Sequence, residues 1–88
     1  MSYIIEFSDE AKMDIIYFQK TGNKPIVSKI KKLIVSIQED PFSGIGKPEP
    51  LRHNLAGLWS RRINREHRLI YEVSEESISI LSLKGHYL

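Results

Sequence analysis

Two amphipathic helical stretches with only three residues between them restrict the fold of this chain more than any other feature. Apolar side chains recur at helical spacing in residues 9–20 and again in residues 24–39. The repeating positions are Ala11, Ile15 and Phe18, widened by Met13, Ile16 and Tyr17, and then Ile26, Ile30, Leu33 and Ile37, extended by Val27 and Ile34. Because the connection Thr21-Gly22-Asn23 is so short, the helices are expected to be antiparallel neighbours, a hairpin that lies on a sheet.

Both helical stretches carry start and stop signals. Ser8 is expected to cap the first helix, and Asn23 is expected to cap the second. Pro25 falls in the first turn of the second helix, where proline is tolerated. Asp40-Pro41 then ends this helix.

Four other segments have the composition of short strands, being rich in β-branched and aromatic residues. They are residues 3–7, 58–63, 68–73 and 77–83. The last three follow one another with short turns between them, which predicts an antiparallel meander. The alternation in the final segment slips near Ile80-Leu81, consistent with a β-bulge there.

Residues 41–57 differ from both kinds of segment. They contain three of the four prolines and three of the five glycines, which predicts a long ordered loop held down by Phe42, Leu51 and Leu55. Residues 1–88 are therefore predicted to form a single α+β domain. An N-terminal strand and two antiparallel helices pack on one face of a small, mainly antiparallel sheet, which the C-terminal three-stranded meander completes.

The size of the chain limits the kind of site it can build. An 88-residue chain buries roughly 60 to 65% of its unfolded surface, enough for one modest core. A functional site is therefore expected in an open groove, which suits a polymer. The absence of cysteine excludes disulfides and thiolate metal sites. No apolar run approaches the roughly 20 residues of a membrane span and no signal peptide is recognised, so a cytoplasmic location is expected.

The arginines are concentrated in one stretch. All five lie between positions 47 and 68, whereas the eight lysines are spread mostly through the first half of the chain. The stretch has six basic and two acidic residues, a net charge of +4, and the rest of the chain carries −2. Because a guanidinium matches two phosphate oxygens at once, the cluster indicates an anion-binding surface and favours nucleic acid. The alternative is a basic outer sheet face with no ligand.

Glu49 is the second notable residue of this stretch. It lies between Pro48 and Pro50, so its backbone is extended and stiff. Helices that cover one face of the sheet leave the other face to the arginines. Arg68 is expected on the central strand there, held by a rigid frame.

These residue types fit one reaction in particular. A ribonuclease that uses no metal needs a base for the 2′-hydroxyl, a cation beside the phosphorane and an acid for the departing 5′-oxygen. Glu49, Arg68 with Arg52, and His86 can supply one of each. Histidine exchanges protons near neutral pH, and a positioned acid or base commonly contributes about 10² to 10⁴ in rate.

Three further residues are candidates for binding the substrate. Arg62 and Lys47 belong to the same basic stretch. Tyr87 can stack on an unpaired base, with packing against the sheet edge as its alternative role.

Other interpretations use the same basic face. A binding module would hold RNA, the ribosome or DNA without cutting it, and a protein-interaction module would hold an acidic disordered peptide. A metal site at His53, Glu66 and His67 is not favoured, because their spacing matches no usual ligand pattern. The sequence has neither a glycine-rich phosphate loop after a strand nor a serine nucleophile elbow.

The motifs also resemble a known family. KPEPLRHNLAGLWSRRINREHRLIYEV at residues 47–73, the entry PFSGIGKPEP at residues 41–50 and the closing His86-Tyr87 strongly resemble the YoeB (Txe) toxins of bacterial type II toxin-antitoxin systems, members of the RelE-like superfamily. The resemblance covers nearly the whole chain. Two positions depart from it: Arg52, where the family commonly has lysine, and Leu88, one residue beyond the usual final tyrosine.

The resemblance implies a RelE-like fold and a cytoplasmic endoribonuclease that cleaves mRNA in the ribosomal A site without a metal or other cofactor. It further implies a YefM-like antitoxin as partner, and a homodimer. Carried to this sequence, Glu49 would be the general base, Arg68 the transition-state cation, His86 the general acid and Tyr87 the substrate positioner.

Overall fold

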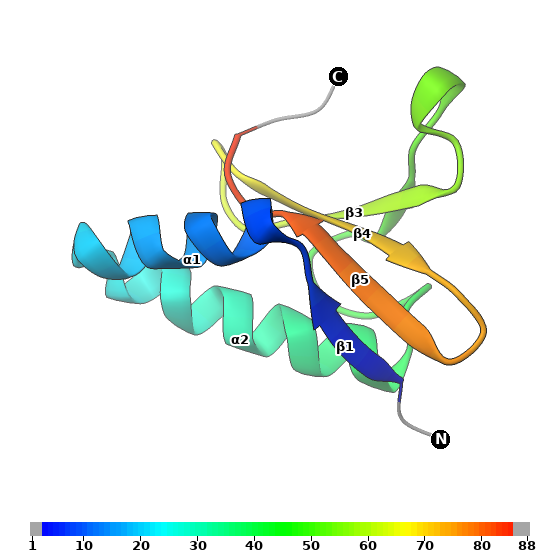
Figure 1. Cartoon of the computed structure of the whole chain (residues 1–88), viewed down its shortest axis with the longest axis horizontal. Helices are drawn as coiled ribbons and strands as arrows, with labels where there is room; N and C mark the ends of the chain where they lie inside the picture. The colour runs from blue at the N-terminus through cyan, green and yellow to red at the C-terminus, as the bar shows by residue number, and fades with distance from the viewer. Residues whose placement is uncertain (1–2, 86–88) are drawn as a thin grey trace.

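A computed structural model of the chain describes residues 3–85 (Figure 1). Its elements keep the predicted order of strand, two helices and three-stranded meander, with two short elements added inside the loop. In chain order they are β1 (Ile4–Phe7), α1 (Asp9–Lys20), α2 (Lys24–Glu39), β2 (Glu49–Pro50), the 3-10 helix η1 (His53–Leu55), β3 (Leu58–Arg62), β4 (Arg68–Val73) and β5 (Ser77–Ser82).

The strands form one five-stranded sheet in the order β1-β5-β4-β3-β2. β1 pairs in parallel with β5, and the other neighbouring strands are antiparallel. The mainly antiparallel sheet and the meander β3-β4-β5 are therefore confirmed. β4, which begins at Arg68, is the central strand, as predicted.

Both helices begin at the predicted caps. Ser8 Oγ accepts a hydrogen bond from the Ala11 N–H at 3.0 Å, and Asn23 Oδ1 accepts one from the Ile26 N–H at 3.3 Å. Each cap satisfies an amide that the helix itself leaves unpaired. Figure 1 shows α1 and α2 running antiparallel as the predicted hairpin. Within residues 3–85, neither helix combines the length and the hydrophobicity that crossing a bilayer requires.

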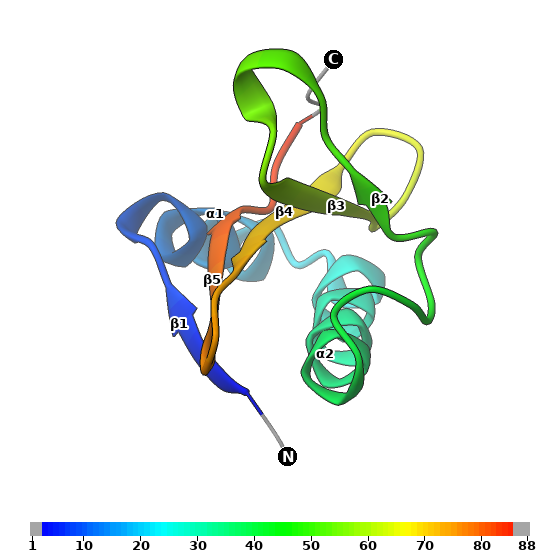
Figure 2. The same ribbon diagram turned by 90° about the vertical axis from the view of Figure 1, so that its right-hand side faces the viewer.

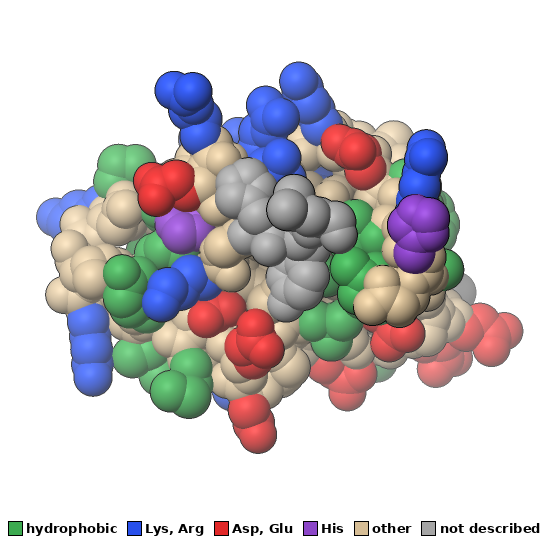
Figure 3. Space-filling model, turned by 90° about the horizontal axis from the view of Figure 1, so that it is seen from above, with side chains coloured by type: hydrophobic (Ala, Val, Ile, Leu, Met, Phe, Trp, Pro, Cys, Tyr) green, Lys and Arg blue, Asp and Glu red, His purple; other side chains and the backbone are tan. Residues whose placement is uncertain are grey.

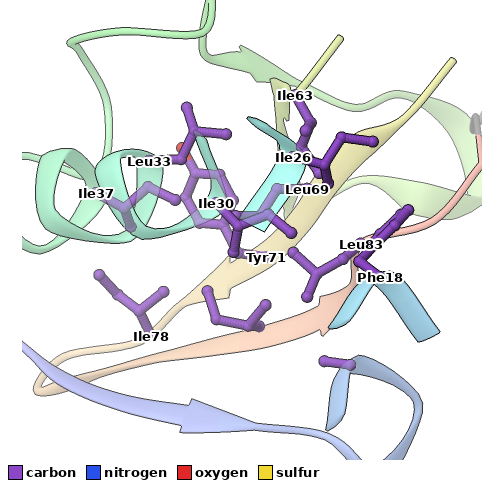
Figure 4. Close-up of a cluster of buried hydrophobic side chains, with 12 residues drawn as sticks. Phe18, Ile26, Ile30, Leu33, Ile37, Ile63, Leu69, Tyr71, Ile78 and Leu83 are labelled. Carbon is purple, nitrogen blue, oxygen red and sulfur yellow. The ribbon is translucent and has the colours of Figure 1, made fainter. Parts of the chain in front are cut away.

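The core lies between the helices and one face of the sheet (Figure 4). Phe18 of α1 and Leu33 of α2 pack with Leu69 and Tyr71 of β4, and all four are 0 to 1% exposed. Burying an apolar side chain of this size contributes about 1.5 to 3 kcal/mol. This core therefore fixes the central strand against α2.

The prediction that Met13, Ile16 and Tyr17 widen the buried apolar face of α1 is wrong. Met13, Ile16 and Tyr17 have exposed fractions of 70%, 47% and 45%, so they lie on the outer side of α1. A helix that packs on one side buries only a narrow stripe, and in α1 the buried residues are Ala11 and Phe18.

The irregularity predicted in the last strand is present. The pairing of β4 with β5 shifts between Ile70 and Tyr71, where Leu81 is the extra residue of a bulge. Ser8 Oγ donates a hydrogen bond to the Leu81 carbonyl at 2.7 Å. The cap residue of α1 thus also ties the helix to the end of β5.

The loop contains a short strand that the sequence did not predict. Glu49 and Pro50 form β2, which pairs with Ser60 and Trp59 at the edge of the sheet. Figures 1 and 2 show the part of the loop that carries η1 extending on the side of the sheet away from α2. The loop therefore joins the sheet at β2 and then extends over the face of the sheet that the helices do not cover.

Apolar contacts hold the loop less firmly than predicted. Leu51 and Leu55 are half-buried as expected, but Phe42 is 51% exposed. The Phe42 ring makes a tilted contact with Trp59, with 5.1 Å between ring centroids. The main attachments of the loop are instead polar, and they come from Arg61 and Tyr71.

Candidate functional site

The cross-strand register divides the side chains of the sheet between two faces. Residues directly opposite one another on neighbouring strands point to the same face. Tyr71, which is opposite Trp59, belongs to the core and marks the face covered by the helices. Glu49 is opposite Ser60, and Ser60 is opposite Ile70, so these three side chains share the second face.

Arg62 and Arg68 lie on the same face as Glu49. They are directly opposite one another on β3 and β4, two residues beyond the Ser60–Ile70 pair. Arg62 is exposed and Arg68 is half-buried. Like charges directly opposite one another repel in a sheet, and a bound anion relieves that repulsion. This pair is therefore a candidate anion-binding feature of the face.

The register also sets the distance between carboxylate and guanidinium. Neighbouring strands are about 4.8 Å apart and successive residues rise about 3.3 Å, so the backbones of Glu49 and Arg68 are roughly 12 Å apart and that of Arg62 is roughly 8 Å from Glu49. Side chains of this length that leave the same face can approach one phosphodiester from two sides. Glu49, Arg62 and Arg68, three of the predicted site residues, thus share one face of the sheet.

The centre of this face is less open than predicted. Ser60, Ile70 and Ser82 have exposed fractions of only 6%, 1% and 1%. Ile70 is buried although it lies outside the hydrophobic cluster under the helices. We call these three buried residues the floor of the face. The charged residues lie beside this covered floor, and electrostatic interactions near buried groups are stronger than in bulk water.

Backbone hydrogen bonds on both sides hold Glu49 in place. The Arg62 N–H donates to the Gly46 carbonyl at 2.6 Å, and the Leu51 N–H donates to the Leu58 carbonyl at 2.8 Å. The two neighbouring prolines restrict the backbone further. The Glu49 side chain itself is exposed, so it is accessible to a substrate.

Lys47 and Arg52 flank Glu49 in the loop, and both are exposed. Lys47 has a φ of 52°, a left-handed conformation at the turn that leads into β2. Figure 3 shows this side of the molecule, with lysine and arginine side chains gathered along one edge.

The chain that leads to the predicted acid is tied to the same strand as Arg68. The Gly85 carbonyl accepts a hydrogen bond from the Arg68 backbone N–H at 3.0 Å, and the Gly85 N–H donates to His67 Nδ1 at 2.9 Å. His86 and Tyr87, predicted as acid and substrate positioner, lie outside the described residues. The backbone one residue before His86 is therefore fixed beside the basic pair.

His67 has a structural role in this arrangement. Besides accepting the Gly85 N–H, its ring packs edge-on against Phe18, with 5.0 Å between ring centroids. In the part of the chain that the structure describes, no three histidine, aspartate or glutamate side chains gather in a way that could hold a metal ion.

Arg61 is placed differently from the other arginines. Sequence reasoning counted it with the anion-binding cluster, but it is fully buried on the face covered by the helices. Its donors pair with oxygen atoms of α2, β4 and the loop. The available signal was the alternation of β3, which puts Arg61 on the same side as Trp59 and Ile63.

Tyr71 completes this buried polar group. Its hydroxyl donates to the Pro41 carbonyl at 2.6 Å and accepts from Arg61 Nε at 3.1 Å. Burial raises the pKa of the Tyr71 hydroxyl above its usual value of 10.0, although the hydrogen bond from Arg61 opposes this change. The hydroxyl thus remains neutral and can donate at physiological pH.

Comparison with known proteins supports the same assignment of family. Residues 7–87 match the sequence profile described as the YoeB-like toxin of bacterial type II toxin-antitoxin systems. Toxin YoeB of Escherichia coli K12 is 51% identical over 81 residues, which cover 92% of this chain and 95% of that protein. Toxin YoeB of Synechocystis is 47% identical over 83 residues, which cover 94% of this chain and 95% of that protein.

Solved structures agree with this match. The YoeB dimer from Staphylococcus aureus has a TM-score of 0.88 at 48% identity, covering 99% of this chain and 100% of that one. A YoeB-YefM complex from Staphylococcus aureus has a TM-score of 0.85 at 49% identity with the same coverage. YafQ of Escherichia coli, at 20% identity and a TM-score of 0.80 over 96% of this chain and 93% of that one, shares the fold, and the predicted RelE-like fold is confirmed. By profile, sequence identity and structure together, this chain belongs to the YoeB family of toxins of bacterial type II toxin-antitoxin systems.

Proposed function

We propose that this toxin is a metal-independent endoribonuclease that cleaves mRNA in the ribosomal A site and so inhibits translation. The observation that carries the proposal is the position of Glu49, Arg62 and Arg68 on one face of the sheet, beside a covered floor. A carboxylate on the same sheet face as two guanidinium groups suits a phosphodiester, because it supplies a proton acceptor beside a site for negative charge.

In the proposed reaction Glu49 removes the proton of the 2′-hydroxyl, and the resulting oxygen attacks the adjacent phosphorus. Arg68, with Arg62 and Arg52, stabilises the charge that grows on the non-bridging oxygens. The bond from phosphorus to the 5′-oxygen then breaks, and His86 donates a proton to that oxygen. The products are a 2′,3′-cyclic phosphate and a 5′-hydroxyl end. Lys47 and Tyr87 are assigned to substrate binding.

The proposal includes two protein partners. The Staphylococcus aureus relatives have been solved as a YoeB dimer and as a YoeB-YefM complex. With 48 to 49% identity to those chains, this toxin is proposed to form a homodimer and to bind a YefM-like antitoxin in the cytoplasm. A basic face of this kind also suits the acidic peptide of a regulatory partner.

The test is primer extension on a translated message, with the wild type beside Glu49→Ala and His86→Ala. A chelator of transition metals that leaves ribosomal Mg²⁺ in place is present throughout. Wild type is expected to cut with chelator present and to leave a 5′-hydroxyl end that polynucleotide kinase labels without prior phosphatase treatment. Each variant is expected to cut about 10² to 10⁴ times more slowly.

Two results would count against this proposal. Equal cleavage by Glu49→Ala and wild type would remove the carboxylate from the mechanism. Salt-sensitive binding to ribosomes with no cut message at any toxin concentration would instead support a binding module on the same face.

A further inference from the structure

The Arg61 clamp is the buried guanidinium of Arg61 together with the carbonyl groups of Asp40, Ser43 and Ile45. Arginine has five N–H donors, and all five are used here. They run from Nε to the Tyr71 hydroxyl (3.1 Å), from Nη1 to the Ser36 hydroxyl (2.8 Å) and the Ile45 carbonyl (3.0 Å), and from Nη2 to the Asp40 carbonyl (2.7 Å) and the Ser43 carbonyl (2.9 Å). Three of the five bonds thus go to the backbone of one loop.

This arrangement shapes the loop in a way that an apolar side chain could not. Loop carbonyls that turn inward need donors, because an unpaired buried carbonyl is destabilising. The guanidinium supplies those donors from one rigid plane, so the backbone from Asp40 to Ile45 must curve around it. Lysine has three donors at a single point and lacks this planar fork.

A second attachment and close packing fix the curved loop against α2. The Tyr71 hydroxyl holds the Pro41 carbonyl at 2.6 Å. A Cβ at Gly44 would overlap the Ser36 hydroxyl, and one at Gly46 would lie 2.6 Å from Leu33 Cδ2. The backbone at these two glycines therefore packs directly against α2.

The clamp connects to Glu49 through a short and stiff piece of chain. Only residues 46–48 separate Ile45 from Glu49. The Gly46 carbonyl is held by the Arg62 N–H at 2.6 Å, and Glu49 pairs with Ser60 in β2 and β3. Arg61 and Arg62 are consecutive on β3, so one strand holds the loop on one side and presents a guanidinium to the site on the other.

We propose that Arg61 is a positioning residue, which holds Glu49 on the same sheet face as Arg62 and Arg68 by fixing the loop that leads into β2. This inference rests on the proposed function, in which Glu49 is the base. Arg61 itself is fully buried and does not touch the substrate. Its effect on cleavage must therefore pass through Glu49.

A double-mutant cycle with Arg61→Lys and Glu49→Ala tests this path. Single-turnover cleavage of translated message is expected to fall by about 10- to 100-fold in Arg61→Lys with little change in apparent affinity, because misplacement by about 1 Å can cost 10²-fold. In the Glu49→Ala background, Arg61→Lys is expected to change the rate by less than about twofold. Equal fractional losses in both backgrounds would overturn the proposal.

A core variant separates positioning from loss of stability. Ile78 is fully buried in β5, which β4 and β3 separate from β2 in the sheet, and Ile78→Val or Ile78→Ala is chosen to match the thermal midpoint of Arg61→Lys. The matched variant is expected to cleave at the wild-type rate. Should it lose as much activity as Arg61→Lys, the role of Arg61 is only structural. Tyr71→Phe, which removes the single hydrogen bond from β4 to the Pro41 carbonyl of the loop, is expected to give a smaller loss of cleavage rate that also disappears in the Glu49→Ala background.

Amide hydrogen exchange gives a readout that does not depend on cleavage. Arg61→Lys is expected to speed exchange at the Arg62 and Leu51 amides, which bond to Gly46 and Leu58, and to leave the Lys12 amide of α1 unchanged. If Arg61→Lys exchanges faster at these amides but the wild type does not cleave message, the nuclease proposal is refuted and the role of Arg61 in fixing the loop is retained. If exchange in Arg61→Lys is unchanged and the wild type cleaves message, the role of Arg61 in fixing the loop is refuted and the nuclease proposal is retained.

Discussion

Arg61 and Arg62 show how one step along a strand changes the role of an arginine. Successive side chains of β3 point to opposite faces. The buried Arg61 guanidinium stabilises the protein only while its donors remain paired, because an unpaired buried charge or partner is strongly destabilising. Arg62 is exposed opposite Arg68, so it contributes little to folding and remains available to an anion.

Matched leucine substitutions are expected to separate the two arginines. Arg61→Leu leaves three loop carbonyls and two hydroxyls without their donor, so the free energy of unfolding is expected to fall by about 3 to 5 kcal/mol. Arg62→Leu is expected to change it by no more than about 0.5 kcal/mol. Urea denaturation of both variants measures the difference, and similar losses would contradict the assigned roles.

Asp40 is expected to contribute a pH-dependent part of the stability. Hydrogen bonds from the Phe42 N–H and then from the Ser43 hydroxyl hold the pKa of the Asp40 carboxyl below its usual 3.8, and the Arg61 charge acts in the same direction. A lowered pKa means that the stabilisation is complete above about pH 4 and is lost as the pH falls through the folded-state pKa. Asp40→Asn should remove this part of the acid dependence in unfolding titrations, and an unchanged profile would exclude it.

At the scale of elements, the helices and the meander could be predicted because each repeats a period over many residues. β2 could not be predicted, since it has only two residues, one of them a proline, and so shows no period. Its position comes from pairing with β3, and in the proposed account also from the clamp supplied by Arg61, which is 11 to 12 residues away in the chain. The exposed Met13 and Tyr17 were misplaced for a related reason: periodicity gives the direction of a helix stripe but not its width.

Two glycines test how tightly the loop packs before β2. Gly46 and Gly57 both have positive φ, 82° and 97°, so alanine at either site introduces backbone strain of roughly 1 to 2 kcal/mol. A Cβ at Gly57 meets open space, whereas one at Gly46 meets Leu33 of α2. Gly46→Ala is therefore expected to lower the free energy of unfolding by about 1 to 3 kcal/mol more than Gly57→Ala does. Thermal unfolding compares them, and equal losses would mean that the loop can move off α2.

At the scale of the whole molecule, the site is assembled from segments that are distant in sequence. The register of β3 with β4 puts Arg62 and Arg68 on one face, and the pairing of β2 with β3 adds Glu49. The burial of Ser60 and Ile70 was not predicted, because the expectation left this face of the sheet open. The roles of His86 and Tyr87 remain predictions.

The central claim is that this assembled face cleaves RNA by attack of the 2′-hydroxyl. The most direct measurement uses a translated message that carries a single 2′-deoxynucleotide on the 5′ side of the cleaved bond. The wild-type toxin is expected to leave this message intact at that bond, while it still cuts the all-ribose message and occupies ribosomes to the same extent. Cleavage of both messages at the same rate would contradict the account.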